Sequence, residues 1–167
     1  MLTEIRVANL RPALTVGQDQ FWTELQQSFP ISHILYPGCG NDNTSTRSVR
    51  DGVIVYLDKA RGYLVERQGC RINAVFAHLP FRDAIFDAIF LQDAHAETDE
   101  VTEITRTLRP GGFLIYSTSD CSEGVPGLLG DLARGDLLDI KKSTHFRKFR
   151  LPFRYPPYLV FQKIVRQ

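Results

Sequence analysis

The chain has 167 residues and is almost neutral, because 20 lysines and arginines stand against 19 aspartates and glutamates. Its 43% hydrophobic and 23% charged residues are typical of a globular protein, which excludes disorder and fibrous repeats. The low net charge gives no attraction of the whole molecule to nucleic acid or to an anionic membrane. This length predicts a single domain.

The sequence lacks the usual marks of metal-binding, membrane and secreted proteins. Three widely spaced cysteines form no Cys-x-x-Cys pair, so we expect neither a zinc site nor a disulfide framework. The longest unbroken apolar run, residues 53–57, is far shorter than a membrane span. Glu4 and Arg6 stand where a signal peptide would be apolar. We therefore expect a cytoplasmic protein that binds no metal and no membrane.

Five short apolar runs, rich in Val, Ile and aromatic residues, predict the strands of a sheet. They occupy residues 33–36, 53–57, 72–76, 88–91 and 113–116. The clearest runs are continuous rather than alternating, which is typical of strands buried on both faces of a parallel sheet.

Apolar residues at helical spacing predict helices between these runs. The helices are expected at residues 21–29, 63–66, 101–108 and 128–132. Pro30 closes the first helix, and the Arg-Pro-Gly-Gly of 109–112 closes the third. This alternation of strand and helix predicts an α/β fold with a mostly parallel sheet.

The tail of the chain departs from that alternation. Residues 140–150 and 155–165 have the pattern of two extended segments with no helix between them. We therefore expect a closing pair of strands, at least one of which runs antiparallel to the rest of the sheet.

A glycine loop and a carboxylate follow the first two predicted strands. Gly38-Cys39-Gly40 comes directly after the first strand, where glycines let the backbone turn sharply and approach a ligand. Asp58 ends the second strand, and a carboxylate there can accept hydrogen bonds from two ribose hydroxyls. The spacing indicates a ligand that contains a nucleoside; the alternative is a turn followed by a solvated aspartate.

The charge of the loop selects among such ligands. Asp42 lies beside the position at which a dinucleotide places its pyrophosphate. Two like charges about 4 Å apart in partly screened surroundings cost roughly 4 kcal/mol, which disfavours NAD or FAD. A cationic ligand without phosphates meets no such repulsion.

Four motifs in order resemble the class I S-adenosylmethionine-dependent methyltransferases, of the type 11-like group. They are Ile-Leu-Tyr-Pro-Gly-Cys-Gly at 34–40, Asp58, His-Leu-Pro-Phe at 78–81 leading to Phe-Asp-Ala-Ile-Phe at 86–90, and Leu-Arg-Pro-Gly-Gly-Phe at 108–113. The resemblance implies a Rossmann-like sheet of seven strands in the order 3-2-1-4-5-7-6, with the last strand antiparallel and helices on both faces. It also implies one domain over 1–167, with a helical lead-in at 1–30, a cofactor-binding core at 31–119 and a closing helix and strand pair at 120–167.

The same resemblance implies S-adenosylmethionine as the cofactor. Its expected contacts are Tyr36, Gly38, Cys39, Gly40, Asp58, Lys59, His78, Leu79 and Gln92. Three positions depart from the family pattern. Tyr36 stands where the family has an acid for the methionine amino group, Asp42 replaces the third glycine, and Val75 replaces an acid that contacts adenine.

Methyl transfer from a sulfonium requires mainly that the acceptor be held in line at close distance, and a base only when the acceptor must lose a proton. His95, with Asp93 nearby, is the candidate acid–base pair after the fourth strand. The alternative is that the acids of this stretch favour the start of the following helix. Cys39 has no adjacent base and is interpreted as a small side chain beside the ligand.

Three functions follow from these features. The first is a methyltransferase that acts on a small molecule, and the second is a methyltransferase-like domain without activity that works as a binding or regulatory domain. Both leave room for a partner chain or a homodimer. The third is an RNA or protein methyltransferase that docks through residues 141–154, which hold six basic residues, no acid, and three phenylalanines able to stack on bases. The alternative interpretation of that strip is a sheet edge protected by charge.

Overall fold

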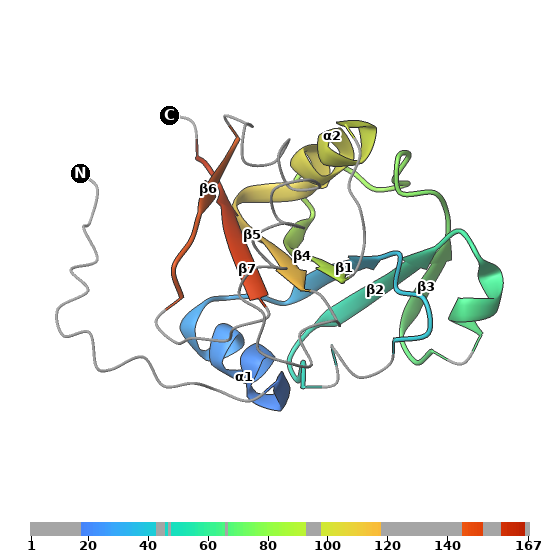
Figure 1. Ribbon diagram of the computed structural model, residues 1–167, viewed down its shortest axis with the longest axis horizontal. Coiled ribbons are helices and arrows are strands. Elements are labelled where there is room, and N and C mark those ends of the chain that lie inside the picture. The colour runs from blue at the N-terminus through green and yellow to red at the C-terminus, as the bar shows by residue number, and fades with distance from the viewer. Residues whose placement is uncertain are drawn as a thin grey trace, which may run out of the picture.

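A seven-stranded sheet forms the centre of the computed structural model, with its strands in the order β3-β2-β1-β4-β5-β7-β6 (Figure 1). The structure describes residues 18–42, 46, 48–65, 67–92, 98–117, 145–151 and 158–165. Its elements are α1 (Gln18–Ser28), β1 (His33–Pro37), β2 (Val53–Asp58), the 3-10 helix η1 (Arg61–Leu64), β3 (Cys70–Asn73), β4 (Phe86–Gln92), α2 (Thr98–Thr107), β5 (Leu108–Ser117), β6 (Phe146–Lys148) and β7 (Tyr158–Lys163).

The pairing of the strands confirms the predicted topology. β1 lies parallel to both β2 and β4, and the parallel set continues to β3 on one side and to β5 on the other. β7 pairs antiparallel with β5, and β6 pairs antiparallel with β7 at the sheet edge. The last strand in the sequence therefore runs against the parallel set, as the resemblance implied.

Alternate side chains of the strands pack against helices on opposite faces of the sheet. Trp22 and Leu25 of α1 are fully buried in a cluster with Tyr36 and Phe90. Ile104 of α2 packs in a second cluster that contains Leu35, Ile89 and Leu114. α1 and α2 therefore cover the two faces, which explains why the central strands are apolar at consecutive positions (Figure 1).

The third strand lies earlier in the chain than its apolar run predicted. β3 covers residues 70–73 instead of 72–76, because it pairs with β2 and that ladder ends where Asn73 faces Asp58. The Asn73 side-chain amide then donates to the carbonyl oxygens of Asp58 and Lys59, at 2.8 and 3.0 Å. Beyond it the chain turns, and Val75 is half-exposed.

The fifth strand begins earlier than predicted. α2 ends at Thr107, and the residues of the Arg-Pro-Gly-Gly motif belong to β5 from Leu108 onward. A bulge accommodates them, since Leu108 pairs with Phe86 whereas Phe113 pairs with Ala88. The short helix expected at 63–66 is the 3-10 helix η1, and the helix expected at 128–132 lies outside the described residues.

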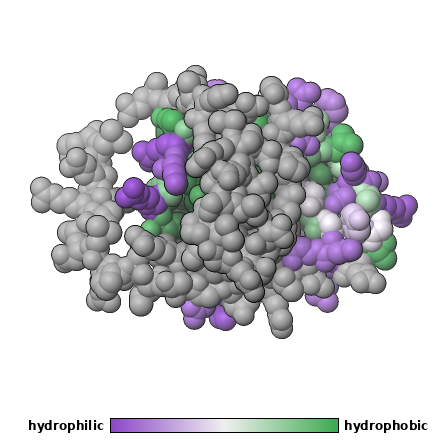
Figure 2. Space-filling model, in the orientation of Figure 1, coloured by the Kyte–Doolittle hydropathy of each residue, from purple (hydrophilic) through white to green (hydrophobic). Residues whose placement is uncertain are grey.

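Most of the described surface in Figure 2 is hydrophilic, with some apolar side chains at the end that η1 and β3 form. Val65, Val75 and Tyr63 are 65%, 49% and 44% exposed. Among the described helices none has the length and apolar character that crossing a membrane requires.

Candidate cofactor-binding site

The glycine loop curls over the end of the neighbouring strand β2. Gly38 and Gly40 have φ angles of 62° and 48°, a left-handed backbone that side chains disfavour. The N–H of Gly38 donates to the carbonyl oxygen of Leu57 at 2.8 Å. The turn therefore brings Gly40 beside the last residue of β2.

Asp58 lies directly under this loop. Its Oδ2 accepts the N–H of Gly40 at 3.0 Å and its Oδ1 accepts the N–H of Ala60 at 2.8 Å. The side chain is 7% exposed, and no Lys or Arg of the described residues forms an ion pair with it. The structure thus brings together the two features that the sequence singled out, and the carboxylate keeps lone pairs for further donors.

Tyr36 is buried and directs its hydroxyl to a carboxylate. The hydroxyl lies 2.6 Å from Oδ2 of Asp42 and 3.4 Å from Oε1 of Gln92. Burial, followed by the hydrogen bond to Asp42, raises the pKa of Tyr36 far above its ordinary value, so the hydroxyl stays a donor at neutral pH. The loop carboxylate is therefore fixed beside the ends of β1 and β4, an arrangement that the sequence did not predict.

Arg67 supports the glycine loop and was not predicted either. Its Nη2 donates to the carbonyl oxygens of Cys39 and Gly40, at 2.9 and 2.8 Å. Its guanidinium carbon lies 4.7 Å from the centre of the Tyr56 ring, within cation–π distance. No motif surrounds Arg67 in the sequence, so no local signal pointed to this role.

The Cys39 side chain is buried beneath the loop. Burial raises the pKa of its thiol, which keeps it protonated and a poor nucleophile. This agrees with its interpretation as a small side chain in the loop. Lys59, directly after β2, and His78, after β3, are both exposed.

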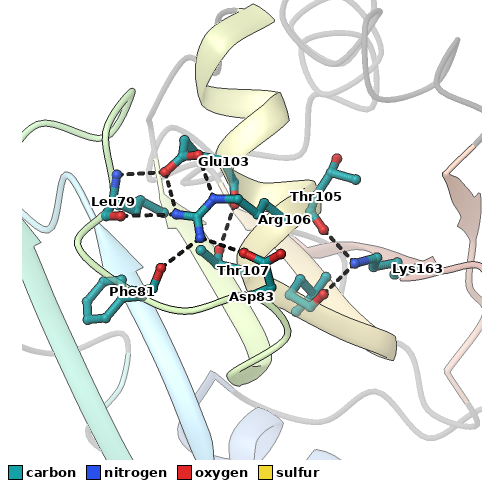
Figure 3. Close-up of polar contacts among 9 residues, drawn as sticks. Leu79, Phe81, Asp83, Glu103, Thr105, Arg106, Thr107 and Lys163 are labelled. Atoms are coloured by element: carbon teal, nitrogen blue, oxygen red, sulfur yellow. Dashed lines mark hydrogen bonds and ion pairs between the residues drawn. The ribbon is translucent and has the colours of Figure 1, made fainter.

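Leu79 is buried, and α2 already engages both of its main-chain polar groups. Its N–H donates to Oε2 of Glu103 at 2.7 Å, and its carbonyl oxygen accepts Nη2 of Arg106 at 3.0 Å (Figure 3). The sequence predicted that the main chain of Leu79 contacts the cofactor. A ligand that used the Leu79 N–H would have to displace Glu103.

Comparisons with known proteins agree with this geometry. A family model described as "Methyltransferase domain" matches residues 35–116, which include the glycine loop and Asp58. The chain is also 28% identical over 114 residues to a demethylmenaquinone methyltransferase of Mycobacterium marinum, a match that covers 61% of this chain and 49% of that protein. The chain therefore spans about half the length of this curated relative. These matches agree with the resemblance of the motifs to the class I S-adenosylmethionine-dependent methyltransferases.

Two solved methyltransferase structures share the fold along most of the chain. The N-methyltransferase NodS of Bradyrhizobium japonicum superposes with a TM-score of 0.57 at 11% identity and covers 89% of this chain and 94% of its own. The 1,6-didemethyltoxoflavin-N1-methyltransferase of Burkholderia thailandensis, solved with 1,6-didemethyltoxoflavin and S-adenosylhomocysteine bound, has a TM-score of 0.55 at 14% identity. That match covers 93% of this chain and 78% of the other.

The predicted catalytic pair, Asp93 and His95, lies outside the described residues. Gln92, at the end of β4, is the nearest predicted site residue that the structure describes, and it lies beside Tyr36. Across the described part of the chain, no three His, Cys, Asp or Glu side chains gather closely enough to hold a metal ion.

The basic strip, residues 141–154, is described only at residues 145–151. Phe146 is buried, and the ring centre of Phe149 lies 5.6 Å from that of Phe29 and 5.2 Å from that of Phe113. These two phenylalanines pack into the domain and are not free to stack on bases. Arg147 and Lys148 are exposed on the edge strand β6, as expected of a sheet edge protected by charge.

Proposed function

We propose that the protein transfers a methyl group from S-adenosylmethionine to a small-molecule acceptor. The observation that carries the proposal is the buried Asp58 carboxylate, held under the glycine loop by the N–H groups of Gly40 and Ala60. A carboxylate so placed accepts the two hydroxyls of a ribose. A Cβ built at Gly40 meets nothing within 4 Å in the described structure, so the loop leaves open space where a ligand would lie.

Asp42 supplies the negative charge that Tyr36 lacks. The Tyr36 hydroxyl holds the Asp42 carboxylate at 2.6 Å, beside the ends of β1 and β4. We propose that this carboxylate receives the ammonium group of the methionine part of the cofactor, through a charge-assisted hydrogen bond. The same charge repels a pyrophosphate, which separates this ligand from dinucleotides.

The cofactor supplies an activated methyl group on a sulfonium. The protein's part is to hold the cofactor and to orient the acceptor. The side chains proposed for this lie at or beside the glycine loop: Asp58, Asp42 and Gln92. An acceptor that must lose a proton also needs a base, and His95 with Asp93 are our candidates for that step. Gln92, which immediately precedes them, lies at the end of a buried central strand.

A small acceptor has the better support among the alternatives. Two of the similar proteins act, by their names, on the small molecules demethylmenaquinone and 1,6-didemethyltoxoflavin. An RNA acceptor has less support, because Phe146 and Phe149 of the basic strip pack against the domain.

Calorimetric titration of the wild-type protein with S-adenosylmethionine, S-adenosylhomocysteine and NAD tests the proposal. We expect binding of the first two and none of NAD. The absence of binding by either sulfur ligand at millimolar concentration would refute the proposal. If the protein binds S-adenosylmethionine but forms no S-adenosylhomocysteine with any of a panel of small acceptors, the result would favour a domain that binds the cofactor without catalysis.

Asp42→Asn tests the ammonium contact, with Asp51→Asn as the matched control. Both variants remove one negative charge, but Asp51 lies just before β2, away from the glycine loop. We expect Asp42→Asn to weaken S-adenosylhomocysteine binding by about tenfold and Asp51→Asn to leave it unchanged. Equal affinities of the two variants would contradict the assignment of Asp42.

A further inference from the structure

Arg106, in the last turn of α2, directs every N–H group of its guanidinium to Glu103 or to the chain between β3 and β4 (Figure 3). Nη1 donates to Phe81 O at 2.7 Å and to Asp83 Oδ1 at 2.9 Å. Nη2 donates to Leu79 O at 3.0 Å and to Glu103 Oε2 at 2.8 Å, and Nε donates to Glu103 Oε1 at 2.8 Å. A guanidinium has five N–H donors, and each of them has a partner here.

Glu103 completes the cluster from one turn earlier on the same helix. Its carboxylate accepts the Leu79 N–H at 2.7 Å as well as the two donors of Arg106. The hydrogen bonds from Arg106 lower the pKa of Glu103, so the carboxylate stays ionised at neutral pH. Both main-chain groups of Leu79 and the carbonyl of Phe81 are therefore held by a single charged pair.

The end of α2 that carries this pair is itself anchored. The ammonium group of Lys163 on β7 donates to the carbonyl oxygens of Thr105 and Leu108, on either side of the helix end. The main-chain carbonyls of Arg106 and Thr107 accept the N–H groups of Ala84 and Ile85. Arg106 and Glu103 thus project from a fixed helix end toward the β3–β4 connection.

The β3–β4 connection, residues 74–85, begins beside the proposed ribose site. Asn73 is paired with Asp58 and donates to its carbonyl oxygen, so the residues that follow Asn73 leave the sheet next to that carboxylate. They form a turn in which the His78 N–H donates to Val75 O at 3.2 Å. A nucleoside whose ribose binds Asp58 would place its base against this turn, and the turn is followed at once by the clamped Leu79.

We propose that Glu103 and Arg106 are positioning residues of the cofactor site. They hold the connection at Leu79 and Phe81, and thereby keep the preceding turn, residues 74–78, in the shape that receives the base. They touch the protein main chain and not the ligand. The inference rests on the proposed function, because it assumes a nucleoside bound through Asp58.

Arg106→Lys tests this inference, and Arg109→Lys is the matched control. Arg109 likewise combines carboxylate and main-chain carbonyl partners, those of Asp87 and Pro30, but neither partner belongs to the β3–β4 connection. A lysine has three donors on one atom and cannot reproduce the planar fork. We expect both variants to lower the melting temperature. Arg106→Lys should also weaken S-adenosylhomocysteine binding by about five- to tenfold, whereas Arg109→Lys should change it by less than about twofold.

Wild-type affinity in folded Arg106→Lys would overturn the positioning role alone. Failure of the wild-type protein to bind S-adenosylhomocysteine would overturn the proposed function, and the inference with it. If Arg106→Lys does not fold, hydrogen exchange of the Leu79 amide in the wild-type protein decides the matter. Slow exchange already before the ligand is added supports a site preformed by Glu103, and fast exchange that slows only with S-adenosylhomocysteine contradicts it.

Discussion

The two ends of the parallel strands each hold a buried aspartate, and the two are satisfied differently. At the amino end, Asp87 accepts the N–H groups of Ser32 and His33 and the Ser32 hydroxyl, and its Oδ1 lies 2.6 Å from Arg109. At the carboxyl end, Asp58 accepts two main-chain N–H groups and has no cation partner among the residues described. One carboxylate is saturated by the protein, and the other is held in place with capacity left over.

The glycines of the two ends repeat this contrast. A Cβ at Gly52, at the amino end, would lie 2.5 Å from the carbonyl oxygen of Ser32, so the backbones there touch. A Cβ at Gly40, at the carboxyl end, would meet no described atom within 4 Å. The amino end is therefore packed for stability, whereas at the carboxyl end the described residues leave space around Gly40. That difference is what a binding site in a doubly wound sheet requires.

Gly52→Ala and Gly40→Ala should separate the two ends most strongly. Gly52→Ala forces two backbones apart and should lower the free energy of unfolding by about 3 kcal/mol. Gly40→Ala meets no steric conflict with the described residues, and its left-handed backbone alone should cost about 1 kcal/mol. Urea unfolding of both variants measures the difference. Equal losses would show that the carboxyl end is packed as tightly as the amino end.

Acid should weaken the amino end through Asp87. Burial alone would raise the pKa of Asp87, but the hydrogen bonds from Ser32 and His33 and the charge of Arg109 together bring it below its ordinary value of 3.8. The ionised form is thus favoured by folding, so its contribution is complete above the ordinary pKa and is lost as the pH falls through the lowered one.

The measurement is the free energy of unfolding of the wild type and of Asp87→Asn as a function of pH. We expect the wild type to be the more stable at neutral pH, and the gap between the two proteins to close as the pH falls below about 4. A gap that stays constant into acid would contradict the role of the ionised Asp87.

Tyr36→Phe should have a small effect on stability and act mainly on ligand binding. It removes the hydroxyl that holds Asp42, which should cost about 1 kcal/mol of unfolding free energy and weaken S-adenosylhomocysteine binding about threefold. Tyr56→Phe is the control, because the Tyr56 hydroxyl bonds Thr46 at 3.0 Å instead of the loop carboxylate. Calorimetry should show weaker binding for the first variant only.

Runs of apolar residues predicted the strands, and the positions of the glycines and Asp58 at strand ends predicted that they lie together. The sheet order and the antiparallel last strand were implied by the resemblance to a known family. The third strand was misplaced by its apolar residues, because its bounds are set by the ladder with β2 and not by hydropathy. The residues that β3 pairs with lie about 15 positions earlier in the chain, so a local apolar pattern does not show where the strand begins and ends.

The supporting side chains could not be predicted for a related reason. Arg67 acts on the loop 27 and 28 positions away, and Arg106 acts on Leu79 from 27 positions away. Asp42 was predicted as a charge near the loop, and Tyr36 as a cofactor contact that lacks the family's acid, but their pairing was not predicted. The local sequence around an arginine or an aspartate does not indicate which distant carbonyl or hydroxyl group it will hydrogen-bond in the fold.

Asp58→Asn and Asp87→Asn together test the difference between the two ends most directly. Both variants replace a buried carboxylate by its amide, and each is measured for S-adenosylhomocysteine affinity and for melting temperature. Asp58→Asn should lose about tenfold or more in affinity with a small change in melting temperature, and Asp87→Asn should keep its affinity while its melting temperature falls by about 5 °C or more. Wild-type affinity in Asp58→Asn, or an equal loss of affinity in both, would contradict a ligand site at the carboxyl end.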